Sequence, residues 1–487
     1  MAEKTENVVI FPLMAQGHMI PFLALALQIE QRKGYSITFI NTPLNINNLR
    51  SSLPPNSSIN LLPIPFSGAD HGLPPGTENT DVLTYPLIYR FVQACSSFKP
   101  AFRRIISDLV SDERRPLCII ADMFFPWTAD VAHEFGISHA IFCGGGGFGF
   151  ACYYSLWLNL PHKKNPDEEE FPLPDFPEAG QIHRTQLAVG LISAGEDDPW
   201  TGFQLKTLPK WANADAVLFN TVGEFDYIGL SYFRRKLGRP VWSLGPVNLS
   251  RKPGKQSGIS SETCIEWLSR KPSNSVLYIS FGSQNTVSAS QMMQLATALE
   301  NSGKNFIWVI KPPLGFDINC QFKAGDWLPE GFEDRIRDQN RGLLVHKWAP
   351  QVEILSHGSI SAFLSHCGWN SVLEALSQGV PIIGWPMAAD QFYNVKLLKE
   401  KMGVCVEVAR GGASEVRHED IVEKIEIVMG ETEKGKEIRR KAGEARDMIW
   451  DAIREQEGCK GSSVKAMDEF FDAAVSMRKE MTQNDSF

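Results

Sequence analysis

The pattern that most constrains this chain lies between residues 348 and 391, where short apolar runs end in polar residues and lead into helices. The run 359–364, SISAFL, has the composition of a buried strand, and residues 380–386, VPIIGWP, predict the next strand. One helix is expected from near Asn370 to Gly379, and another from Asp390. Strands and helices therefore alternate, which predicts a parallel sheet covered by helices.

Polar side chains follow the first of these strands and lead into the helix. Ligands of open parallel sheets bind outside the carboxyl ends of the strands, and helix N-termini attract anions. We therefore expect a phosphate beside His366, Asn370 and Ser371, with Glu374 one turn further on. Ser371 and Glu374 also match the S-x-x-E capping box at the predicted helix start.

The same segment carries a long motif. It resembles the donor-binding signature of the plant secondary-product UDP-glycosyltransferases, glycosyltransferase family 1. The matching residues are W-A-P-Q (348–351), H-C-G-W-N-S (366–371), Glu374, G-V-P (379–381), W-P (385–386) and Asp390–Gln391. The resemblance implies an α/β protein of the GT-B fold, with two doubly wound Rossmann-like domains facing a cleft. It also implies an enzyme with UDP-glucose as co-substrate and no cofactor.

Composition limits the partners and the compartment. A net charge of −8 and a pI near 5.8 argue against nucleic acid or an anionic membrane as the main partner. The nine cysteines are dispersed without a C-x-x-C pair, which indicates reduced thiols in the cytoplasm. The apolar run VVIFPL is too short for a signal peptide, and no run approaches the roughly 20 residues of a membrane span. The related animal enzymes have a C-terminal membrane anchor, whereas this chain ends in polar residues. We expect a cytoplasmic monomer without a stable membrane anchor.

Two halves flank residues 248–261, a Gly-, Ser- and Lys-rich stretch that predicts a linker. Pro21 is a plausible first residue of a helix that ends at Gly34. Proline-rich stretches at 53–76 and 161–178 predict surface loops. Further strands are expected at 7–13, 36–42, 117–122, 138–142, 216–221, 241–245, 275–281, 305–311 and 343–348. We predict an acceptor-binding domain at 1–247 and a UDP-sugar-binding domain at 262–459, with a helix of about 460–487 packing back on the first domain.

His18 and Asp122 are the candidate catalytic residues. His18 follows the first strand, and imidazole is the side chain best matched to proton abstraction at neutral pH. Asp122 ends the strand 117–122, where its carboxylate could bind Nδ1 of His18 and stabilise the imidazolium. Each residue has a structural alternative as a helix cap. The segment A-Q-G-H (15–18) and the strand-end aspartate match the family, which favours a general-base dyad.

The resemblance also assigns the donor site. It implies that Trp348 stacks on uracil, that Gln351 and Glu374 meet the ribose, and that Ser283 contacts phosphate. Asp390 and Gln391 would bind the sugar. A glutamine at the last position accompanies glucose donors, and Trp369 stands where users of glucuronic acid tend to have arginine. The full predicted set is Ser283, Trp348, Ala349, Gln351, His366, Trp369, Asn370, Ser371, Glu374, Asp390 and Gln391.

No metal site is expected. The chain contains no D-x-D motif, and His346, His357, His366 and Cys367 lack metal-ligand spacing. Helix-terminus amides together with His366, Asn370 and Ser371 would instead stabilise the leaving UDP.

The glycine run 144–147 departs from the family pattern. Many relatives have a hydroxyl residue here, and four glycines predict a loose, roomy loop. Gly144, Gly146 and Gly149 also match G-x-G-x-x-G, with an acidic run at 167–170 about twenty residues on. A dinucleotide-dependent oxidoreductase is therefore one alternative. A sugar-nucleotide-binding protein without catalysis is another.

The acceptor is the least defined part of the hypothesis. Several aromatic residues of the first half could line its pocket, above all Phe124, Phe148 and Phe203. They suit a small lipophilic plant metabolite such as a phenolic, a flavonoid or a terpenoid. Each of these rings is equally compatible with a place in the core. The sequence thus predicts an inverting UDP-glucose-dependent O-glucosyltransferase whose aglycone it does not specify.

Overall fold

The structure is a computed structural model. It describes residues 6–81, 83–247, 249, 259–317, 320–346, 348–412, 414–456 and 458–484, and most of the predicted linker lies outside these ranges. The chain forms two compact units, each described here by itself. The first comprises Met1–Gln181, Gly190–Gly254 and Asp451–Phe487, and the second comprises Ile182–Val189 and Lys255–Trp450.

A seven-stranded parallel sheet lies at the centre of the first unit. Its strand order is β3-β2-β1-β4-β5-β8-β9, and every neighbouring pair is parallel. The central strands are buried along their whole length, as expected for a sheet covered on both faces. The strands are β1 (Asn7–Phe11), β2 (Ser36–Asn41), β3 (Asn60–Pro63), β4 (Cys118–Asp122), β5 (Ser138–Cys143), β8 (Ala216–Phe219) and β9 (Val241–Ser243).

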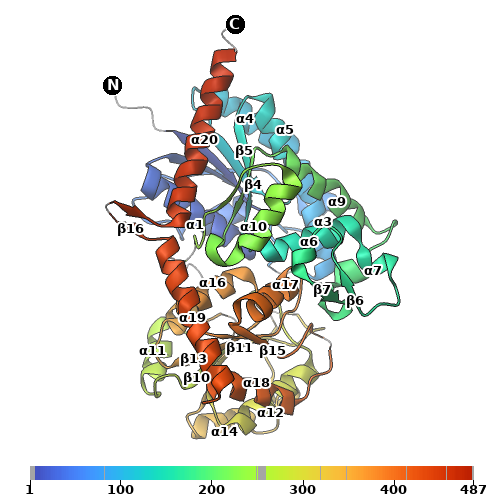
Figure 1. Ribbon diagram of the computed structural model, residues 1–487, viewed down its shortest axis with the longest axis vertical. Helices are drawn as coiled ribbons and strands as arrows, with labels where there is room; N and C mark the ends of the chain where they lie inside the picture. Colours follow the sequence, from blue (N-terminus) through green and yellow to red (C-terminus); the bar gives the residue numbers. More distant parts are fainter. Residues whose placement is uncertain are drawn as a thin grey trace. The chain divides into compact units, whose positions relative to one another are not determined.

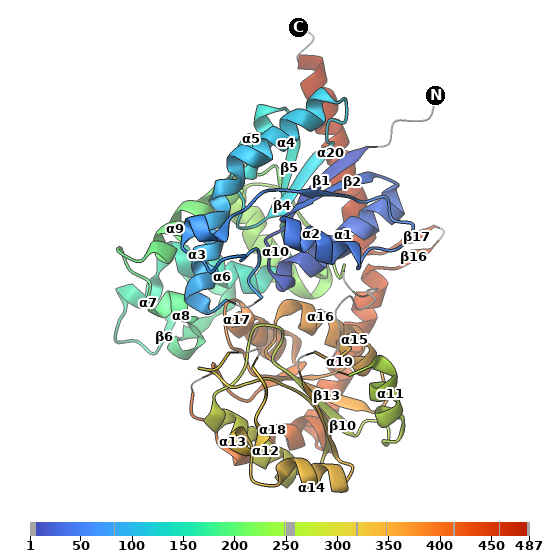
Figure 2. The same cartoon turned by 180° about the vertical axis from the view of Figure 1, so that it is seen from behind.

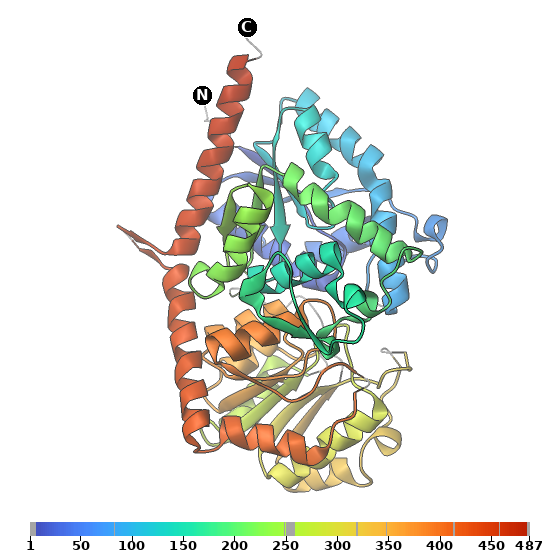
Figure 3. The same cartoon turned by 45° about the vertical axis from the view of Figure 1, so that its right-hand side comes forward.

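Helices from both ends of the chain cover this sheet. Figure 1 shows α20 running along the sheet. In this helix, Met467, Phe470 and Phe471 belong to the same apolar core as the central strands. The short hairpin of β16 (Glu455–Gln456) and β17 (Cys459–Lys460) projects beside the start of α20 (Figure 3). The helices are α1 (Gln16–Lys33), α2 (Pro43–Arg50), α3 (Tyr85–Ala94), α4 (Lys99–Ser111), α5 (Thr128–Glu134), α6 (Gly147–Asn159), α7 (Pro161–Lys164), α9 (Pro199–Thr207), α10 (Gly223–Leu237) and α20 (Ser462–Asn484).

The second unit repeats the plan with a six-stranded parallel sheet in the order β12-β11-β10-β13-β14-β15. Alternate residues of β10 face opposite sides. Leu277 and Ile279 join the core formed with α12 and α18, while Tyr278 reaches α15. These three helices are labelled in Figure 2. The strands are β10 (Val276–Ser280), β11 (Asn305–Ile310), β12 (Gly342–His346), β13 (Ile360–Ser365), β14 (Ile382–Gly384) and β15 (Cys405–Glu407). The helices are α11 (Ser261–Ser269), α12 (Ala289–Ser302), α13 (Ala324–Trp327), α14 (Phe332–Asp338), α15 (Gln351–Leu355), α16 (Trp369–Ser377), α17 (Gln391–Lys396), η6 (Leu397–Met402, a π-helical turn), α18 (His418–Met429) and α19 (Glu433–Ala452). The short helix α8 (Val189–Ile192) belongs to the first unit except for its first residue.

Both sheets reverse their strand order at the centre. In the first sheet the reversal lies between β1 and β4, and in the second it lies between β10 and β13. Loops that leave adjacent strands in opposite directions open a crevice at the carboxyl edge, which is where ligands bind in such sheets. The two reversal points therefore mark the two places to examine for a site.

Three predictions about the elements are wrong. The first helix begins at Gln16, so Pro21 lies inside it and His18 lies on its first turn. The stretch 53–76 contains the strand β3, and the stretch 161–178 contains α7 and the strand β6 (Glu170–Pro172), which is followed by β7 (Gln181–His183). The proline content of these stretches indicates loops. Proline is, however, tolerated at helix starts and on edge strands, so short elements of both kinds can contain it.

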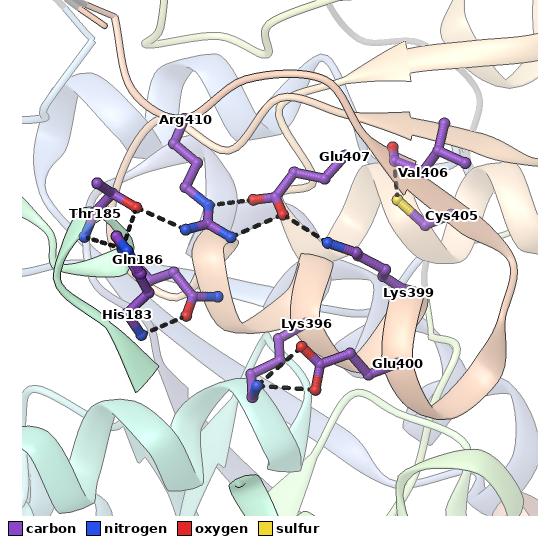
Figure 4. A network of polar contacts seen from close by, with 10 residues as sticks. All are labelled: His183, Thr185, Gln186, Lys396, Lys399, Glu400, Cys405, Val406, Glu407 and Arg410. Atoms are coloured by element: carbon purple, nitrogen blue, oxygen red, sulfur yellow. Dashed lines mark hydrogen bonds and ion pairs between the residues drawn. The ribbon is translucent and has the colours of Figure 1, made fainter. Parts of the chain in front are cut away.

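The segment Ile182–Val189 groups with the second unit although it belongs to the N-terminal half of the sequence. Arg410 holds it there by donating to Thr185 Oγ1 at 2.6 Å while pairing with both oxygens of Glu407 (Figure 4). Burial alone would raise the pKa of Glu407, but Arg410 and Lys399 hold it below its ordinary value. This side-chain network had no local signature in the sequence.

Helices α6 and α10 cross with their backbones in contact. A Cβ added to Gly229 would lie well inside van der Waals distance of the Phe148 nitrogen and the Gly147 carbonyl carbon. A Cβ added to Gly147 would lie 3.1 Å from the Leu230 nitrogen. Because the obstructing atoms are backbone, neither helix can yield by a change of side-chain rotamer.

We predict that Gly229→Ala lowers the free energy of unfolding by about 3 kcal/mol, since overpacking a rigid contact is costly. Urea denaturation followed by tryptophan fluorescence measures the change. The matched control is Gly202→Ala in α9, where a Cβ meets nothing within 4 Å. That variant should gain about 0.5–1 kcal/mol from the greater helix propensity of alanine. Equal effects of the two variants would contradict the prediction.

Candidate active site

His18 and Asp122 meet at the reversal point of the first sheet. The His18 Nδ1 atom lies 2.8 Å from Asp122 Oδ2, which joins the first turn of α1 to the end of β4. The side chain of His18 is 24% exposed, whereas that of Asp122 is fully buried. With Nδ1 donating to the carboxylate, Nε2 is the basic nitrogen of the ring.

Backbone amides fix the carboxylate of Asp122. Its Oδ2 also accepts from Leu13 N at 3.1 Å, and its Oδ1 accepts from Phe124 N at 3.1 Å. These donors come from the loop before α1 and the loop after β4. The carboxylate is therefore oriented independently of His18, and it can hold one tautomer of the imidazole and stabilise its protonated form.

Aromatic rings continue outward from His18. The ring of Phe124 lies 5.8 Å from the imidazole and contacts Trp200 at 6.1 Å and Phe203 at 6.5 Å. Tyr89, which the sequence analysis did not single out, stacks on Trp200 at 4.4 Å. Its position one turn after Tyr85 on α3 was the available signal. The third predicted ring differs, because Phe148 is fully buried and packs on Phe176.

A second cluster lies beside the reversal point of the other sheet. Gln351 Nε2 donates to Ser371 Oγ at 2.9 Å and to Glu374 Oε2 at 2.7 Å, and its Oε1 lies 3.3 Å from the hydroxyl of Tyr278. The predicted capping box is wrong. Helix α16 begins at Trp369 after Gly368, so Ser371 and Glu374 lie inside the helix and bind Gln351 instead.

His366 follows β13 and is packed between two glycines. Its Nε2 atom lies 2.5 Å from the Cβ position of both Gly282 and Gly368, so neither site admits a larger residue. Burial, followed by the nearby charge of Lys311, lowers the pKa of His366 to about 4. The Nδ1 atom of His366 is buried and has no hydrogen-bond partner among the described residues. The imidazole of His366 is thus neutral near pH 7, and its Nδ1 atom can form a further hydrogen bond.

Lys311 is a site residue that the sequence analysis missed. It follows β11, and its ammonium group donates to the carbonyl oxygens of Gly282 and Ser283, the latter at 2.8 Å. The strands β11, β10 and β13 are neighbours, so Lys311, the 282–283 turn and His366 line one carboxyl edge. Ser283 itself is exposed there. A lone lysine after a strand has no pattern that would have marked it.

Strained backbone surrounds this edge. Cys367 and Ala389 both have left-handed φ angles, at 61° and 52°, which are unfavourable for residues other than glycine. The buried Asn394 ties the two loops together by donating to Cys367 O at 3.0 Å and to Asp390 Oδ2 at 2.9 Å. Gln391 Oε1 accepts from the amides of residues 387 and 388.

The remaining predicted residues lie along the same edge. Trp348 is partly buried just after β12, and Ala349 beside it is buried. Trp369 and Asn370 are the first two residues of α16, where backbone amides have no helical acceptor. In the part of the chain that the structure describes, no group of acidic, histidine and cysteine residues could hold a metal ion.

Comparisons with known proteins identify the family of this chain. The family model described as UDP-glucoronosyl and UDP-glucosyl transferase matches residues 255–440. UDP-glycosyltransferase 92A1 of Arabidopsis thaliana is 48% identical over 478 residues, which cover 96% of this chain and 97% of the relative. Crocetin glucosyltransferase 3 of Crocus sativus is 42% identical over 88% of this chain and 92% of its own length. The chain is a plant family 1 UDP-glycosyltransferase.

Solved structures of this family show the same fold. A Glycyrrhiza uralensis enzyme in complex with glycyrrhetinic acid 3-O-monoglucuronide is 29% identical, with a TM-score of 0.83 and coverage of 99% of this chain and 98% of the other. Phytolacca americana UGT2 in complex with UDP-2fluoro-glucose and pterostilbene has a TM-score of 0.77 at 27% identity, covering 97% and 100%. The protein is a GT-B glycosyltransferase with two Rossmann-like domains. Among its described helices, none is both long and apolar enough to cross a membrane.

The glycine run of this glycosyltransferase is not loose, contrary to the prediction. The amides of Gly147 and Phe148, at the start of α6, donate to the two oxygens of the buried Asp226. A pyrophosphate in a dinucleotide site needs those same amides. The exposed acidic residues 167–169 precede β6 in a peripheral hairpin and do not end a strand of the large sheet. The geometry therefore does not suit the oxidoreductase alternative.

The lowered pKa of His366 predicts a pH-dependent stability. The unfolded state binds a proton near pH 6.5 and the folded state near pH 4, so this contribution is present above pH 6.5 and is lost as the pH falls toward 4. We expect the group to lower the free energy of unfolding by about 2 kcal/mol between pH 8 and pH 5. Urea denaturation at both pH values should show a smaller pH effect in His366→Asn than in the wild type. An unchanged pH effect would mean that His366 does not titrate as described.

Proposed function

We propose that this protein is an inverting UDP-glucose:acceptor O-glucosyltransferase for a small lipophilic plant metabolite. The carrying observation is the His18–Asp122 pair at the reversal point of the first sheet, beside the ring of Phe124. The donor signature of the second unit supplies the other half of the argument. We further propose residues 1–247 as the acceptor domain and 262–459 as the UDP-sugar domain.

The proposed chemistry is direct displacement. His18 Nε2 takes the proton of the acceptor hydroxyl, and Asp122 stabilises the resulting imidazolium. The acceptor oxygen attacks the anomeric carbon of glucose from the face opposite UDP. The bond between that carbon and the β-phosphate oxygen breaks, and UDP leaves with the electron pair. The product is a β-glucoside.

Polar and aromatic side chains of the second unit would bind UDP. We propose that Trp348 stacks on the uracil and that Gln351 and Glu374, already joined by a hydrogen bond, hold the ribose. The amides at the start of α16, with Ser371 and His366, would meet the diphosphate, so that no metal is required. The oxygen of Gln391 is held by backbone amides, which leaves its amide nitrogen to donate to a glucose hydroxyl.

Named relatives support glucose as the donor and aromatic or terpenoid acceptors. Besides crocetin glucosyltransferase 3, they include a scopoletin glucosyltransferase of Nicotiana tabacum and a flavonoid 3-O-glucosyltransferase of Fragaria ananassa. The half-buried rings of Phe124, Phe203 and Tyr89, which pack on the buried Trp200, offer flat apolar surface for such a compound. The identity of the aglycone, the monomeric state and the cytoplasmic location stay predictions.

The first test is mass spectrometry of the purified protein incubated with UDP-glucose and a pool of plant aglycones. We expect a hexose-sized gain on at least one acceptor. His18→Ala should lower the turnover number by about 10²–10⁴-fold, because it removes the general base, while leaving the affinity for UDP unchanged. The matched control is His133→Ala, which breaks a similar pair with Asp215 (3.1 Å) at the amino edge of the same sheet. Retained turnover in His18→Ala would overturn the mechanism. Binding of UDP-glucose by the wild type without any product would favour the non-catalytic alternative.

Lys311 provides a test of the donor site. Its charge lies at the proposed diphosphate edge, so Lys311→Met should weaken binding of UDP at least tenfold and binding of uridine less than twofold. Isothermal titration with both ligands measures the difference. Lys304→Met is the control, because Lys304 precedes the same strand at its other end and pairs with Glu426. Equal losses for UDP and uridine would show that Lys311 only shapes the loop.

A further inference from the structure

The turn between β5 and α6, residues 144–147, is held from one side by a buried carboxylate. Asp226 Oδ2 accepts from Gly147 N at 2.6 Å and from Thr221 Oγ1 at 2.8 Å, and Oδ1 accepts from Phe148 N at 2.8 Å. Asp226 is fully buried, and these three donors are all uncharged. Each carboxylate oxygen thus binds one of the first two amides of α6, so Asp226 fixes the point at which the turn passes into the helix.

The backbone of α10 is shaped to place this carboxylate. Asp226 has φ and ψ angles of −115° and 17°, which are not helical, and the helix is kinked at this residue. Three residues later, the contact of Gly229 with Phe148 and Gly147 brings the two helices together.

The opposite side of the turn lies close to the helix that carries His18. A Cβ added to Gly144 would lie 2.9 Å from Pro21 Cγ and 3.4 Å from the carbonyl oxygen of Gly17. Gly17 directly precedes His18 on the first turn of α1. The Asn220 side chain donates to Gly144 O at 3.4 Å, which adds a weaker restraint from the β8 side. The glycine turn is therefore wedged between α10 and the first turn of α1.

We propose that Asp226 is a positioning residue for His18, acting through the glycine turn. It holds residues 144–147 against Gly17 and Pro21 and so sets where the imidazole meets the acceptor hydroxyl. Glycine is required at residue 144 because any side chain would displace α1. This inference rests on the proposed role of His18 as the base. It assigns a purpose to the glycine run, where this chain departs from its family pattern.

The decisive variant is Asp226→Asn. It keeps the shape of the side chain but turns an NH2 group toward one of the two amides, so that donor faces donor and the turn loses one anchor. A displacement of about 1 Å at a catalytic group costs roughly 10²-fold in rate. We therefore expect kcat to fall about 10–100-fold, with KM for UDP-glucose unchanged within about twofold. Glu224→Gln, an exposed carboxylate on the same helix, is the matched control and should keep full activity.

Gly144→Ala tests the contact between the glycine turn and α1 and leaves Asp226 unchanged. Its Cβ would push on Pro21, so it should reproduce the loss of kcat with unchanged KM for UDP-glucose. The acceptor for all assays is the compound with the largest hexose gain in the mass-spectrometric screen. Rates are expressed per UDP-binding site, counted by titration, so that misfolded protein does not lower the apparent kcat.

The outcomes separate the possibilities. Loss of kcat in both Asp226→Asn and Gly144→Ala supports the positioning role. A lower melting temperature with unchanged kcat in both variants would show that the contacts are merely structural. If Asp226→Asn fails to fold, the kcat of Gly144→Ala decides in the same way. A wild type that binds UDP-glucose but transfers no sugar would instead overturn the proposed function, and hydrogen exchange at residues 147–148 would then show whether Asp226 still fixes the turn.

Discussion

The reversal of strand order in the two parallel sheets is the constraint on which the rest of this structure depends. Parallel strands are joined by right-handed crossovers, so a chain that builds outward in both directions from a central strand must leave two adjacent loops pointing apart. In the first unit this brings His18 and Asp122 together although 104 residues separate them. In the second unit the same reversal sets the 282–283 turn beside His366. The positions of the polar side chains follow from the topology before any specific contact is made.

Close approach of backbone then gives these edges their rigidity. His366 lies between two glycines with no room for a side chain, and Cys367 next to it has an unfavourable left-handed conformation. Such strain persists only where surrounding contacts determine the geometry. Asn394 supplies that support, because one buried amide spans the loops containing Cys367 and Asp390. A preorganised edge of this kind has little to rearrange when an anionic ligand arrives.

The sequence predicted the features that have a local signature. Alternating strands and helices, polar residues at strand ends and the aspartate closing β4 follow from periodicity and position alone. The features it missed depend on distant partners. Ser371 and Glu374 match a capping box, but both bind Gln351 of another helix. Pro21 is a residue at which a helix could start, but the helix already begins at Gln16. The four glycines predicted a loose loop because the carboxylate that binds Gly147 lies 79 residues away in the sequence, where no local pattern indicates the contact.

Two buried aspartates of the first unit bind backbone amides in the same way but have different third partners. Asp122 and Asp226 are both inaccessible to solvent, and each accepts two backbone amides from the loops that it fixes. The difference is the third partner. Asp122 faces an imidazole that can become a cation, so its charge can stabilise a proton taken from a substrate. Asp226 accepts instead from a threonine hydroxyl, which cannot become a cation, and burial raises its pKa to about 6. A carboxylate in that setting can act on the reaction only by where it places the backbone, and the backbone it places adjoins the helix of His18.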